Sequence, residues 1–436
     1  MGIKKIVIKG NEKINGKVRV SGAKNSVLKL ICASILLKKG TLTLNNVPNL
    51  SDVITLLGLI NTIGGKITLN GDLSKENDGK TLIIDPTKIN KFTAPYETVS
   101  QMRATFIVLG PLLARFGQAK VSLPGGCAIG TRALDIHFDA LKQMGVDIQI
   151  DDGYVIAKAK NGKIQGADIK FRFASVGATE NIMLSATLAE GITRIENPAK
   201  EPEIIDLANC LNKMGAKITG AGTPLIEIEG VKELHSAEYT VMGDRIEAGS
   251  FMIGALLTGG ELEISGINFD VLENFTDELK KMNADIKRID KTTLKIKRKK
   301  TSLKATNIIT GPHPEFPTDL QSPVMALLAG INGDSTIDET VFENRFMHVA
   351  ELVRMNADIQ VMGNKAIIEG HNGCYKGAEV MATDLRAGMA LILAGIAGNG
   401  ETEVRRYYHV ERGYEFIDRK LQKCGVDVKI LYEKKD

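Results

Sequence analysis

One short, glycine-rich segment, Pro124–Arg132, combines a thiol with a cation. It reads PGGCAIGTR, so Cys127 and Arg132 share one loop between an apolar strand and an apolar helix. Glycine pairs allow backbone conformations that other residues avoid, and loops of this composition often carry binding or catalytic groups. A nearby cation lowers the pKa of a thiol toward the reactive range. Cys127 is therefore a candidate reactive cysteine, with a structural role as the alternative, whereas Cys32 and Cys210 fall on apolar helical stretches and are expected in a core.

Polar and basic residues gather at the starts of six predicted helices. Free N–H groups and the positive end of the helix dipole favour phosphates and carboxylates at such places. Lysine and arginine oppose the dipole there, so their presence indicates an anionic ligand. The alternative is that each Ser, Thr or Asp is an ordinary N-cap. The segments concerned are Ser21–Asn25, Gln101–Arg103, Ser175–Thr179, Asp244-Arg245, Thr318-Asp319 and Thr383–Arg386.

No motif of this sequence points to a metal or an organic cofactor. There is no Walker-type or dinucleotide-binding glycine motif, no G-x-S-x-G and no H-E-x-x-H, and the six histidines lack metal-ligand spacing. The basic run Lys297–Lys300 is typical of a solvated strand edge, with a nucleic-acid patch as the alternative. We therefore expect no cofactor, no metal and no nucleic-acid partner.

The composition is that of an ordinary globular protein of two or more domains. The 436 residues include 56 Lys and Arg against 52 Asp and Glu, and the net charge of +4 still allows a local basic cleft. Five cysteines without a C-x-x-C pair are typical of a reduced, intracellular chain. The N-terminus MGIKKIVIKG has no signal-peptide core, and the apolar run 387–400 is shorter than the roughly 20 residues that span a bilayer. We expect a cytoplasmic protein without a membrane segment.

Six copies of a short tag divide the chain into repeats. Each tag has Gly or Asn at its second position, then a small residue, a charged residue and Ile or Val, which is typical of a left-handed helix C-cap leading into a strand. Each repeat then reads helix, strand, helix, strand, with further strands before the next repeat. The repeat that contains Pro124–Arg132 is about four residues longer in this loop, and an insertion in one copy points to function. The second positions of the tags are 64, 145, 215, 283, 356 and 425.

The sixth repeat ends at the C-terminus before supplying its last strands, and the N-terminal residues can replace them. The segment Ile6–Gly10 resembles Ile226–Gly230 and Ala366–Gly370, each of which precedes another helix start. We therefore predict an α/β protein with two domains of three βαβαββ units each. Units one to three occupy residues 23–243, and units four to six occupy residues 244–436, closed by the N-terminal residues 1–22.

Nine motifs, in order along the chain, resemble the UDP-N-acetylglucosamine 1-carboxyvinyltransferases, a family of enolpyruvyl transferases. They are GAKN (22–25), PGGCAIGTR (124–132), SVGATENIM (175–183), EPEI (201–204), DRIEAG (244–249), PHPEFPTD (312–319), ETVFENRFMH (339–348), ATDLRA (382–387) and ERGYE (411–415). The resemblance implies two inside-out, barrel-like α/β domains with the substrate cleft between them, which agrees with the six repeats. It also implies that the 3′-hydroxyl of UDP-N-acetylglucosamine attacks C2 of phosphoenolpyruvate and that phosphate is lost, the first committed step of peptidoglycan precursor synthesis.

The resemblance also assigns roles to individual residues. Cys127 is expected to be the acid that protonates C3 of phosphoenolpyruvate or to form a covalent adduct with it, and Asp319 to be the base. Lys24 and Arg412 complete the expected catalytic set, and the epoxide fosfomycin is expected to alkylate Cys127. The expected phosphoenolpyruvate contacts are Lys24, Asn25, Arg132, Arg345, Arg386 and Arg412. The expected UDP-sugar contacts are Arg103, Arg132, Ala133, Leu134, Asp135, Ser175, Val176, Gly177, Asp319 and Val341.

Two positions depart from the family pattern, and two rival hypotheses stay open. Ala133-Leu134 stand where the family often has Pro-Val, and Phe173 stands where a base-binding cation is expected, with Arg172 beside it. One rival is a shikimate enolpyruvyl transferase, which lacks the cysteine loop. The other is a non-catalytic clamp for a polyanion, which leaves Cys127 and the insertion unexplained. We also expect the domains to close on the nucleotide sugar.

Overall fold

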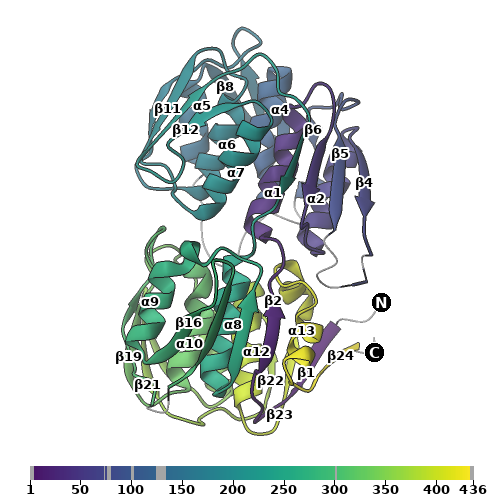
Figure 1. Cartoon of the computed structure of the whole chain (residues 1–436). Coiled ribbons are helices and arrows are strands. Elements are labelled where there is room, and N and C mark those ends of the chain that lie inside the picture. Colours follow the sequence, from purple (N-terminus) through teal and green to yellow (C-terminus); the bar gives the residue numbers. More distant parts are fainter. Residues whose placement is uncertain are drawn as a thin grey trace. The chain divides into compact units, whose positions relative to one another are not determined.

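The chain forms two compact units (Figure 1). The terminal unit contains the described residues up to Ser21 and from Gly243 onward, and the central unit contains those from Gly22 to Met242. Three expected site residues, Cys127, Arg132 and Ala133, lie outside the described residues. The computed structural model describes residues 4–72, 74–75, 80–99, 103–123, 134–299 and 302–432.

The described part of the central unit contains three four-stranded sheets, in the orders β14-β3-β5-β4, β6-β7-β9-β8 and β10-β11-β13-β12. Its strands are β3 (Leu42–Asn45), β4 (Lys66–Asn70), β5 (Thr81–Asp85), β6 (Thr93–Ala94), β7 (Gln118–Ser122), β8 (Val146–Asp151), β9 (Tyr154–Ala159), β10 (Asp168–Lys170), β11 (Ile192–Glu196), β12 (Lys217–Thr219), β13 (Leu225–Glu229) and β14 (Ala237–Thr240). Its helices are α1 (Lys24–Ala33), η1 (Ser34–Leu36), α2 (Ser51–Thr62), α3 (Tyr96–Val99), η2 (Arg103–Val108), α4 (Leu109–Phe116), α5 (Asp135–Gln143), α6 (Val176–Ala186) and α7 (Pro202–Lys213).

The described part of the terminal unit also contains three four-stranded sheets, in the orders β2-β15-β17-β16, β18-β19-β21-β20 and β22-β23-β1-β24. Its strands are β1 (Lys4–Lys9), β2 (Gly16–Arg19), β15 (Glu261–Ser265), β16 (Ala284–Arg288), β17 (Thr293–Arg298), β18 (Ile308–Ile309), β19 (Gly333–Asp338), β20 (Asp358–Met362), β21 (Lys365–Gly370), β22 (Glu379–Met381), β23 (Glu401–Arg405) and β24 (Val428–Tyr432). Its helices are α8 (Arg245–Thr258), η3 (Phe269–Leu272), α9 (Glu273–Lys281), η4 (Thr318–Leu320), α10 (Gln321–Ala329), α11 (Val349–Arg354), α12 (Leu385–Ala397), η5 (Tyr407–Arg412) and α13 (Ile417–Lys423).

All six sheets of the described residues share one pairing scheme. In the orders given above, the first strand is parallel to the second, and the other two neighbouring pairs are antiparallel. A parallel pair needs a crossover connection, which a helix usually supplies. Helix α6 does so between β10 and β11, and α12 does so between β22 and β23. The predicted α/β fold of six repeated units is confirmed.

The two N-terminal strands complete sheets that the C-terminal repeats leave open. Strand β1 lies between β23 and β24 and is antiparallel to both. Strand β2 pairs with β15, and β14 pairs with β3, although α1 follows β2 and α8 follows β14 along the chain. Each unit therefore closes its own sheets, even though the chain leaves the terminal unit after Ser21 and returns to it at Gly243.

Gly or Asn adopts a left-handed backbone conformation in every tag. A side chain with a Cβ is strained there, and only glycine and, less often, asparagine are common at such a helix end. This requirement explains why the tag has the same two residue types in all six copies. The φ angles are +110° at Gly64, +78° at Gly145, +100° at Gly215, +69° at Asn283, +74° at Asn356 and +87° at Gly425.

Three apolar helices lie buried at the centre of the terminal unit. In the terminal unit, α10 is buried along its whole length, and α8 and α12 are buried except near their ends. Gly254 lets α8 approach its neighbours, because a Cβ there would lie 2.7 Å from Ile14 Cδ1 and 2.8 Å from Leu393 Cδ2. Each unit has its own hydrophobic core. Among the described residues, no helix is long and apolar enough to span a bilayer.

Candidate active site

Asp319 lies on a single 3₁₀ turn, η4, rather than in the α-helix that follows. Pro323 explains this arrangement. In a continuous α-helix its ring would clash with the carbonyl group four residues earlier, which is that of Asp319. The α-helix α10 therefore begins only at Gln321, and the separate turn before it carries the Asp319 side chain.

Pro111 has the same effect in the central unit. The α-helix α4 begins at Leu109, and the residues before it form the 3₁₀ helix η2, which begins at Arg103. The sequence predicted one helix start at Gln101–Arg103, whereas the described part shows a 3₁₀ helix first, because Pro111 excludes an α-helix over the preceding turn. For Arg103 the structure describes the backbone only.

Two buried arginines hold the Asp319 carboxylate. Arg345 Nη2 donates a hydrogen bond to Oδ1 at 2.9 Å, and Arg386 Nη2 donates one to Oδ2 at 3.0 Å. The arginines are only 3% and 2% exposed. Arg386 belongs to the first turn of α12, where its N–H group donates to the capping carboxylate of Asp384 at 2.8 Å. Counted together, Asp319 and its two arginines carry a formal charge of +1.

The arginines govern the protonation of Asp319. Burial raises the pKa of this carboxyl, but attraction by Arg386 and then by Arg345 outweighs burial, and Arg245 adds to the attraction. The pKa of Asp319 is therefore held far below its usual range. A carboxylate in this state is a poor proton acceptor, because the efficiency of a general base falls as its pKa falls away from the working pH.

Both guanidinium groups keep a donor that no described residue accepts. The Nε atoms of Arg345 and Arg386 are buried and have no hydrogen-bond partner among the described residues. A buried donor without an acceptor is costly, and a guanidinium matches a carboxylate or phosphate with two parallel hydrogen bonds. The cluster therefore favours an additional anionic ligand.

Arg412 belongs to an element that packs against the same helix. It is the last residue of η5 and is partly buried. Helix η5 contacts α12, whose first turn carries Arg386. The terminal unit thus carries Arg345, Arg386 and Arg412, three of the cations that the resemblance assigned to phosphoenolpyruvate.

Glu339 is an organising residue that the sequence analysis did not single out. It is 2% exposed, and its Oε1 accepts the N–H groups of Val341 and Phe342 at 2.9 and 3.1 Å. The Thr318 hydroxyl donates to its Oε1 and Oε2 at 3.0 and 2.9 Å. Glu339 therefore joins the loop of Val341 to the turn of Asp319. Its place at the head of the ETVFENRFMH motif was the available signal, but the bond to Thr318 depends on the fold.

The central unit carries Lys24 and Asn25 at the start of α1. Ala23 offers no side-chain cap, and the first turn contains no acidic residue. Lys24 is 8% exposed and forms an ion pair with Asp52 of α2 at 2.8 Å. A carboxylate from a neighbouring helix therefore compensates the cation that opposes the α1 dipole.

The predicted UDP-sugar contacts of the central unit lie at the starts of two further helices. Ser175 caps α6, its hydroxyl accepting the Ala178 N–H group at 3.4 Å, so that Val176 and Gly177 form the first turn. Leu134 and Asp135 begin α5. Helices α5 and α6 contact each other, and both starts therefore belong to one packed pair.

Arg172 and Phe173 occupy the position that departs from the family pattern. Arg172 forms an ion pair with Asp135, and this hydrogen bond holds the pKa of the Asp135 carboxyl below its usual value. Phe173 exposes 48% of its surface, and the Arg172 guanidinium lies 5.4 Å from the centre of its ring. The guanidinium of Arg172 is therefore already paired with Asp135, and Phe173 is the residue that offers an exposed surface.

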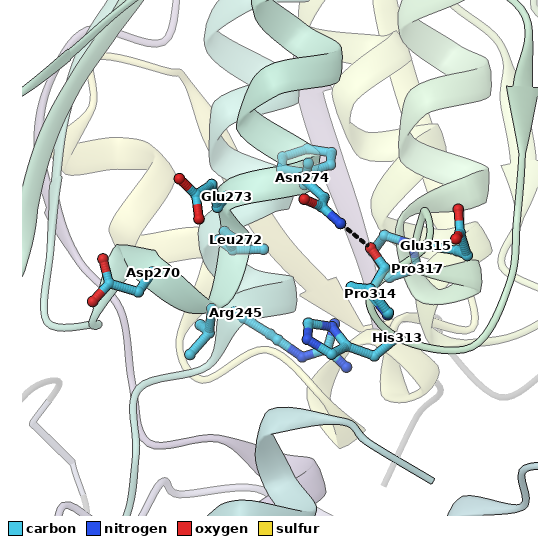
Figure 2. A pocket seen from close by; sticks show the side chains of 11 residues that line it. Arg245, Asp270, Leu272, Glu273, Asn274, His313, Pro314, Glu315 and Pro317 are labelled. Carbon is cyan, nitrogen blue, oxygen red and sulfur yellow. Dashed lines mark hydrogen bonds between the residues drawn. The ribbon is translucent and has the colours of Figure 1, made fainter. Parts of the chain in front are cut away.

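The terminal unit contains a cavity of about 180 Å³ (Figure 2). Arg245, His313 and Pro317 line it, and Pro317 precedes Asp319 by two residues. Because acidic residues line it as well, the cavity favours neither an anion nor a cation. The acidic residues concerned are Asp270, Glu273 and Glu315. No group of three or more His, Cys, Asp and Glu side chains suited to a metal ion occurs in the described part of the chain.

Comparison with known proteins assigns this chain to a family. The family model described as EPSP synthase (3-phosphoshikimate 1-carboxyvinyltransferase) matches residues 8–421, and the chain belongs to this family of enolpyruvyl transferases. Solved structures show the same fold. The enolpyruvyl transferase NikO from Streptomyces tendae has a TM-score of 0.88 at 23% identity, covering 100% of both chains. EPSP synthase from Acinetobacter baumannii has a TM-score of 0.74 at 19% identity, covering 98% of this chain and 100% of that one.

Curated relatives are closer in sequence. A UDP-N-acetylglucosamine 1-carboxyvinyltransferase of Azorhizobium caulinodans is 49% identical over 426 residues, which cover 97% of this chain and 98% of the relative. Proteins of the same name from Chelativorans sp. and Xanthobacter autotrophicus are each 48% identical, with the same coverage. The likeness therefore extends over nearly the full length of both partners.

Proposed function

We propose that this chain transfers the enolpyruvyl group of phosphoenolpyruvate to the 3′-hydroxyl of UDP-N-acetylglucosamine and releases phosphate. The product is a precursor of peptidoglycan, and the step is the first committed one of that synthesis. The observation that carries the proposal is the identity of 48–49%, over nearly the full length, with relatives named for this reaction. The positively charged cluster around Asp319 supports it, because phosphoenolpyruvate carries two anionic groups.

The reaction adds the sugar to phosphoenolpyruvate and then eliminates phosphate. The 3′-oxygen forms a bond to C2 while its proton passes to a base and C3 gains a proton from an acid. The C2–O bond to phosphate then breaks, phosphate leaves with the bonding electrons, and C3 loses a proton to restore the double bond. In this proposal Cys127 supplies the acid, and Lys24, Asn25, Arg132 and Arg412 bind the phosphate. The UDP-sugar contacts are those named from the resemblance.

Asp319 serves as the base only after its surroundings change. Between Arg345 and Arg386 it is a poor proton acceptor. The carboxylate of phosphoenolpyruvate suits the same two guanidinium groups, whose Nε atoms have no acceptor among the described residues. When that carboxylate shares the arginines, their hold on Asp319 weakens and its pKa rises. The arrival of phosphoenolpyruvate thus activates the base, which takes its proton from the other substrate, the nucleotide sugar.

Fosfomycin and the cellular compartment belong to the same proposal. The epoxide is expected to alkylate Cys127 and none of Cys32, Cys210, Cys374 and Cys424; burial, the largest effect on each thiol, raises the pKa of Cys32, Cys210 and Cys374. A thiol with a raised pKa holds little of the nucleophilic thiolate. We place the reaction in the cytoplasm, because multiply charged phosphorylated substrates do not cross an apolar bilayer unaided.

Sugar-dependent phosphate release from the purified chain tests the proposed function. Phosphate should appear when phosphoenolpyruvate and UDP-N-acetylglucosamine are both present, and the Cys127→Ser variant should lose nearly all turnover while it keeps its fold. Shikimate 3-phosphate in place of the nucleotide sugar tests the rival transferase, and it should give no phosphate. Release with the shikimate substrate alone would replace our proposal by the rival, and no release with either acceptor would favour a non-catalytic clamp.

A further inference from the structure

Three buried carboxylates from three different helices surround the first turns of α1. Asp52 of α2, Glu180 of α6 and Asp206 of α7 are 4%, 2% and 7% exposed. Asp52 pairs with Lys24 at 2.8 Å, and Asp206 accepts a hydrogen bond from the Ser26 hydroxyl. Glu180 pairs with Lys29, its Oε1 lying 3.3 Å from Nζ. We call these three carboxylates the α1 collar.

The α1 collar stabilises one helix at a high cost in desolvation free energy. A Ser or Asp N-cap would satisfy the start of α1 locally, but Ala23 makes no such bond. Burial of an ion pair costs desolvation energy that the attraction often fails to recover, and an apolar pair of similar volume is frequently more stable. The collar also fixes the orientation of α1, because each carboxylate connects α1 to a different neighbouring helix.

The pair Lys29–Glu180 joins the two helices that carry the proposed substrate contacts of the central unit. Lys29 Nζ also donates a hydrogen bond to the carbonyl oxygen of Asn25 at 2.7 Å, so the lysine holds the turn that contains the proposed phosphate contact. Glu180 lies on α6, whose first turn, Ser175–Gly177, contains the proposed UDP-sugar contacts. One side-chain bridge therefore connects the backbone of Asn25 to α6.

We propose that Glu180 is a positioning residue for the transfer reaction. Through Lys29 it fixes the start of α1, with Lys24 and Asn25, relative to the start of α6. The inference rests on the proposed function, because it takes the roles of those residues from it. Positional errors of about 1 Å at a reacting centre cost up to a hundredfold in rate, so even a small rotation of α1 against α6 should be measurable.

The surroundings of Glu180 give this role a pH dependence. Lys29 and Cys32 of α1 face it, together with Glu201 and Glu203 at the start of α7. Burial is the largest effect and raises the pKa of Glu180 to about 7, against the attraction of Lys29. Below that pH the carboxyl becomes neutral and the bridge to Lys29 loses its ionic part. Turnover of the wild type should therefore show an acid limb near pH 7 that depends on Glu180.

The test compares Glu180→Gln with a matched control in the other unit. Glu180→Gln keeps the size of the side chain and removes its charge, and we expect kcat/KM to fall at least tenfold at pH 8. The control is Glu403→Gln, which removes the partner of Lys5, an ion pair of 2.6 Å between β1 and β23. The control should change kcat/KM less than twofold. The Glu180→Gln profile should also lack the acid limb near pH 7.

A double variant separates positioning from mere stability. Lys29→Met combined with Glu180→Leu replaces the ion pair by an apolar one and should keep the midpoint of urea unfolding near that of the wild type. If positioning is the role, the double variant stays at least tenfold slow despite its stability, and amide exchange in the first turn of α1 is faster than in the wild type. Wild-type kcat/KM in Glu180→Gln, or full recovery of rate in the double variant, would overturn the inference.

Failure of the proposed function would look different. If the wild type releases no phosphate from the two substrates, the proposed function fails, whatever the variants do. If the wild type turns over and Glu180→Gln equals it across the pH range, only the positioning role fails.

Discussion

The two units hold their charged groups in opposite ways. In the terminal unit, one carboxylate, Asp319, is shared by two buried arginines, and the cluster keeps a positive charge. In the central unit, Lys24 and Lys29 each have a carboxylate of their own, Asp52 and Glu180, and these pairs are neutral. The terminal cluster therefore keeps an unbalanced positive charge that suits an anion, whereas each central pair balances its lysine with a carboxylate and fixes the position of the α1 start.

The largest effect is expected at the shared carboxylate. Asp319→Asn should lower turnover about a thousandfold, because the reaction loses its base. The amide also cannot balance two buried cations, so the unfolding midpoint in urea should fall. The measurement is phosphate release at saturating substrates. Turnover within tenfold of the wild type would show that Asp319 is not the base. The functional contrast that we draw between the two units would then fail.

A smaller effect is expected at the matching carboxylate of the central unit. Asp52→Asn leaves Lys24 in place as a cation but removes the charge that holds it, so kcat/KM for phosphoenolpyruvate should fall about tenfold. The same phosphate assay, run at varied phosphoenolpyruvate, measures it. A loss as large as that of Asp319→Asn would mean that the Asp52 carboxylate itself takes part in the chemistry and does not merely hold Lys24.

One buried histidine in each unit allows the two units to be compared by the pH dependence of their folding stability. Burial lowers the pKa of His137 in the central unit and of His348 in the terminal unit to about 4 each. Between pH 6.5 and 4 the unfolded chain binds a proton that each folded imidazole does not, so stability is full above pH 6.5 and falls by about 1.4 kcal/mol per pH unit for each. His137→Gln should remove one such contribution.

Urea unfolding at several pH values between 4.5 and 7 measures this slope. His348→Gln is the matched variant in the terminal unit. If both variants keep the wild-type slope, the two imidazoles do not titrate as their burial requires.

The smallest effect is expected at Phe173. We expect its exposed ring to stack on the uracil base of the proposed substrate, so Phe173→Ala should raise KM for UDP-N-acetylglucosamine about fivefold. The chain contains no Trp, so Phe173→Trp introduces one reporter whose fluorescence UDP-N-acetylglucosamine should quench. Tyr432→Trp, at an exposed site of the terminal unit, is the control. Equal responses of the two reporters would contradict a base contact at Phe173.

The repeat architecture could be predicted because short-range residue preferences determine it. A left-handed helix end accepts few residue types, so Gly64 and Asn283 mark equivalent places even though the residues around them differ. The same reasoning identified helix starts such as Asp244 and Asp384, whose carboxylates cap α8 and α12. Local rules were sufficient for these features.

The inner arrangement of the site could not be predicted in the same way. Lys29 meets Glu180, and Glu339 meets Thr318, only because the fold packs distant elements together. Nothing in the sequence near these residues distinguishes a buried pair from a solvated surface charge. The 3₁₀ turn of Asp319 is an intermediate case. The four-residue spacing from Asp319 to Pro323 indicates that an α-helix cannot begin at Asp319, but the apolar residues that follow predict a helix start there.

The pairing of β1 with β24 makes the two units differ in when they can be completed during synthesis. The central unit has all its strands once residue 242 has been made, whereas the terminal unit needs β24, in which Tyr432 is the partner of Lys4. At ordinary rates of synthesis the interval is roughly 10 to 40 s. Until β23 and then β24 are made, β1 lacks both of its neighbours, and such an unpaired strand is a place where nascent chains associate wrongly. Strand β24 thus protects a strand that was made long before it.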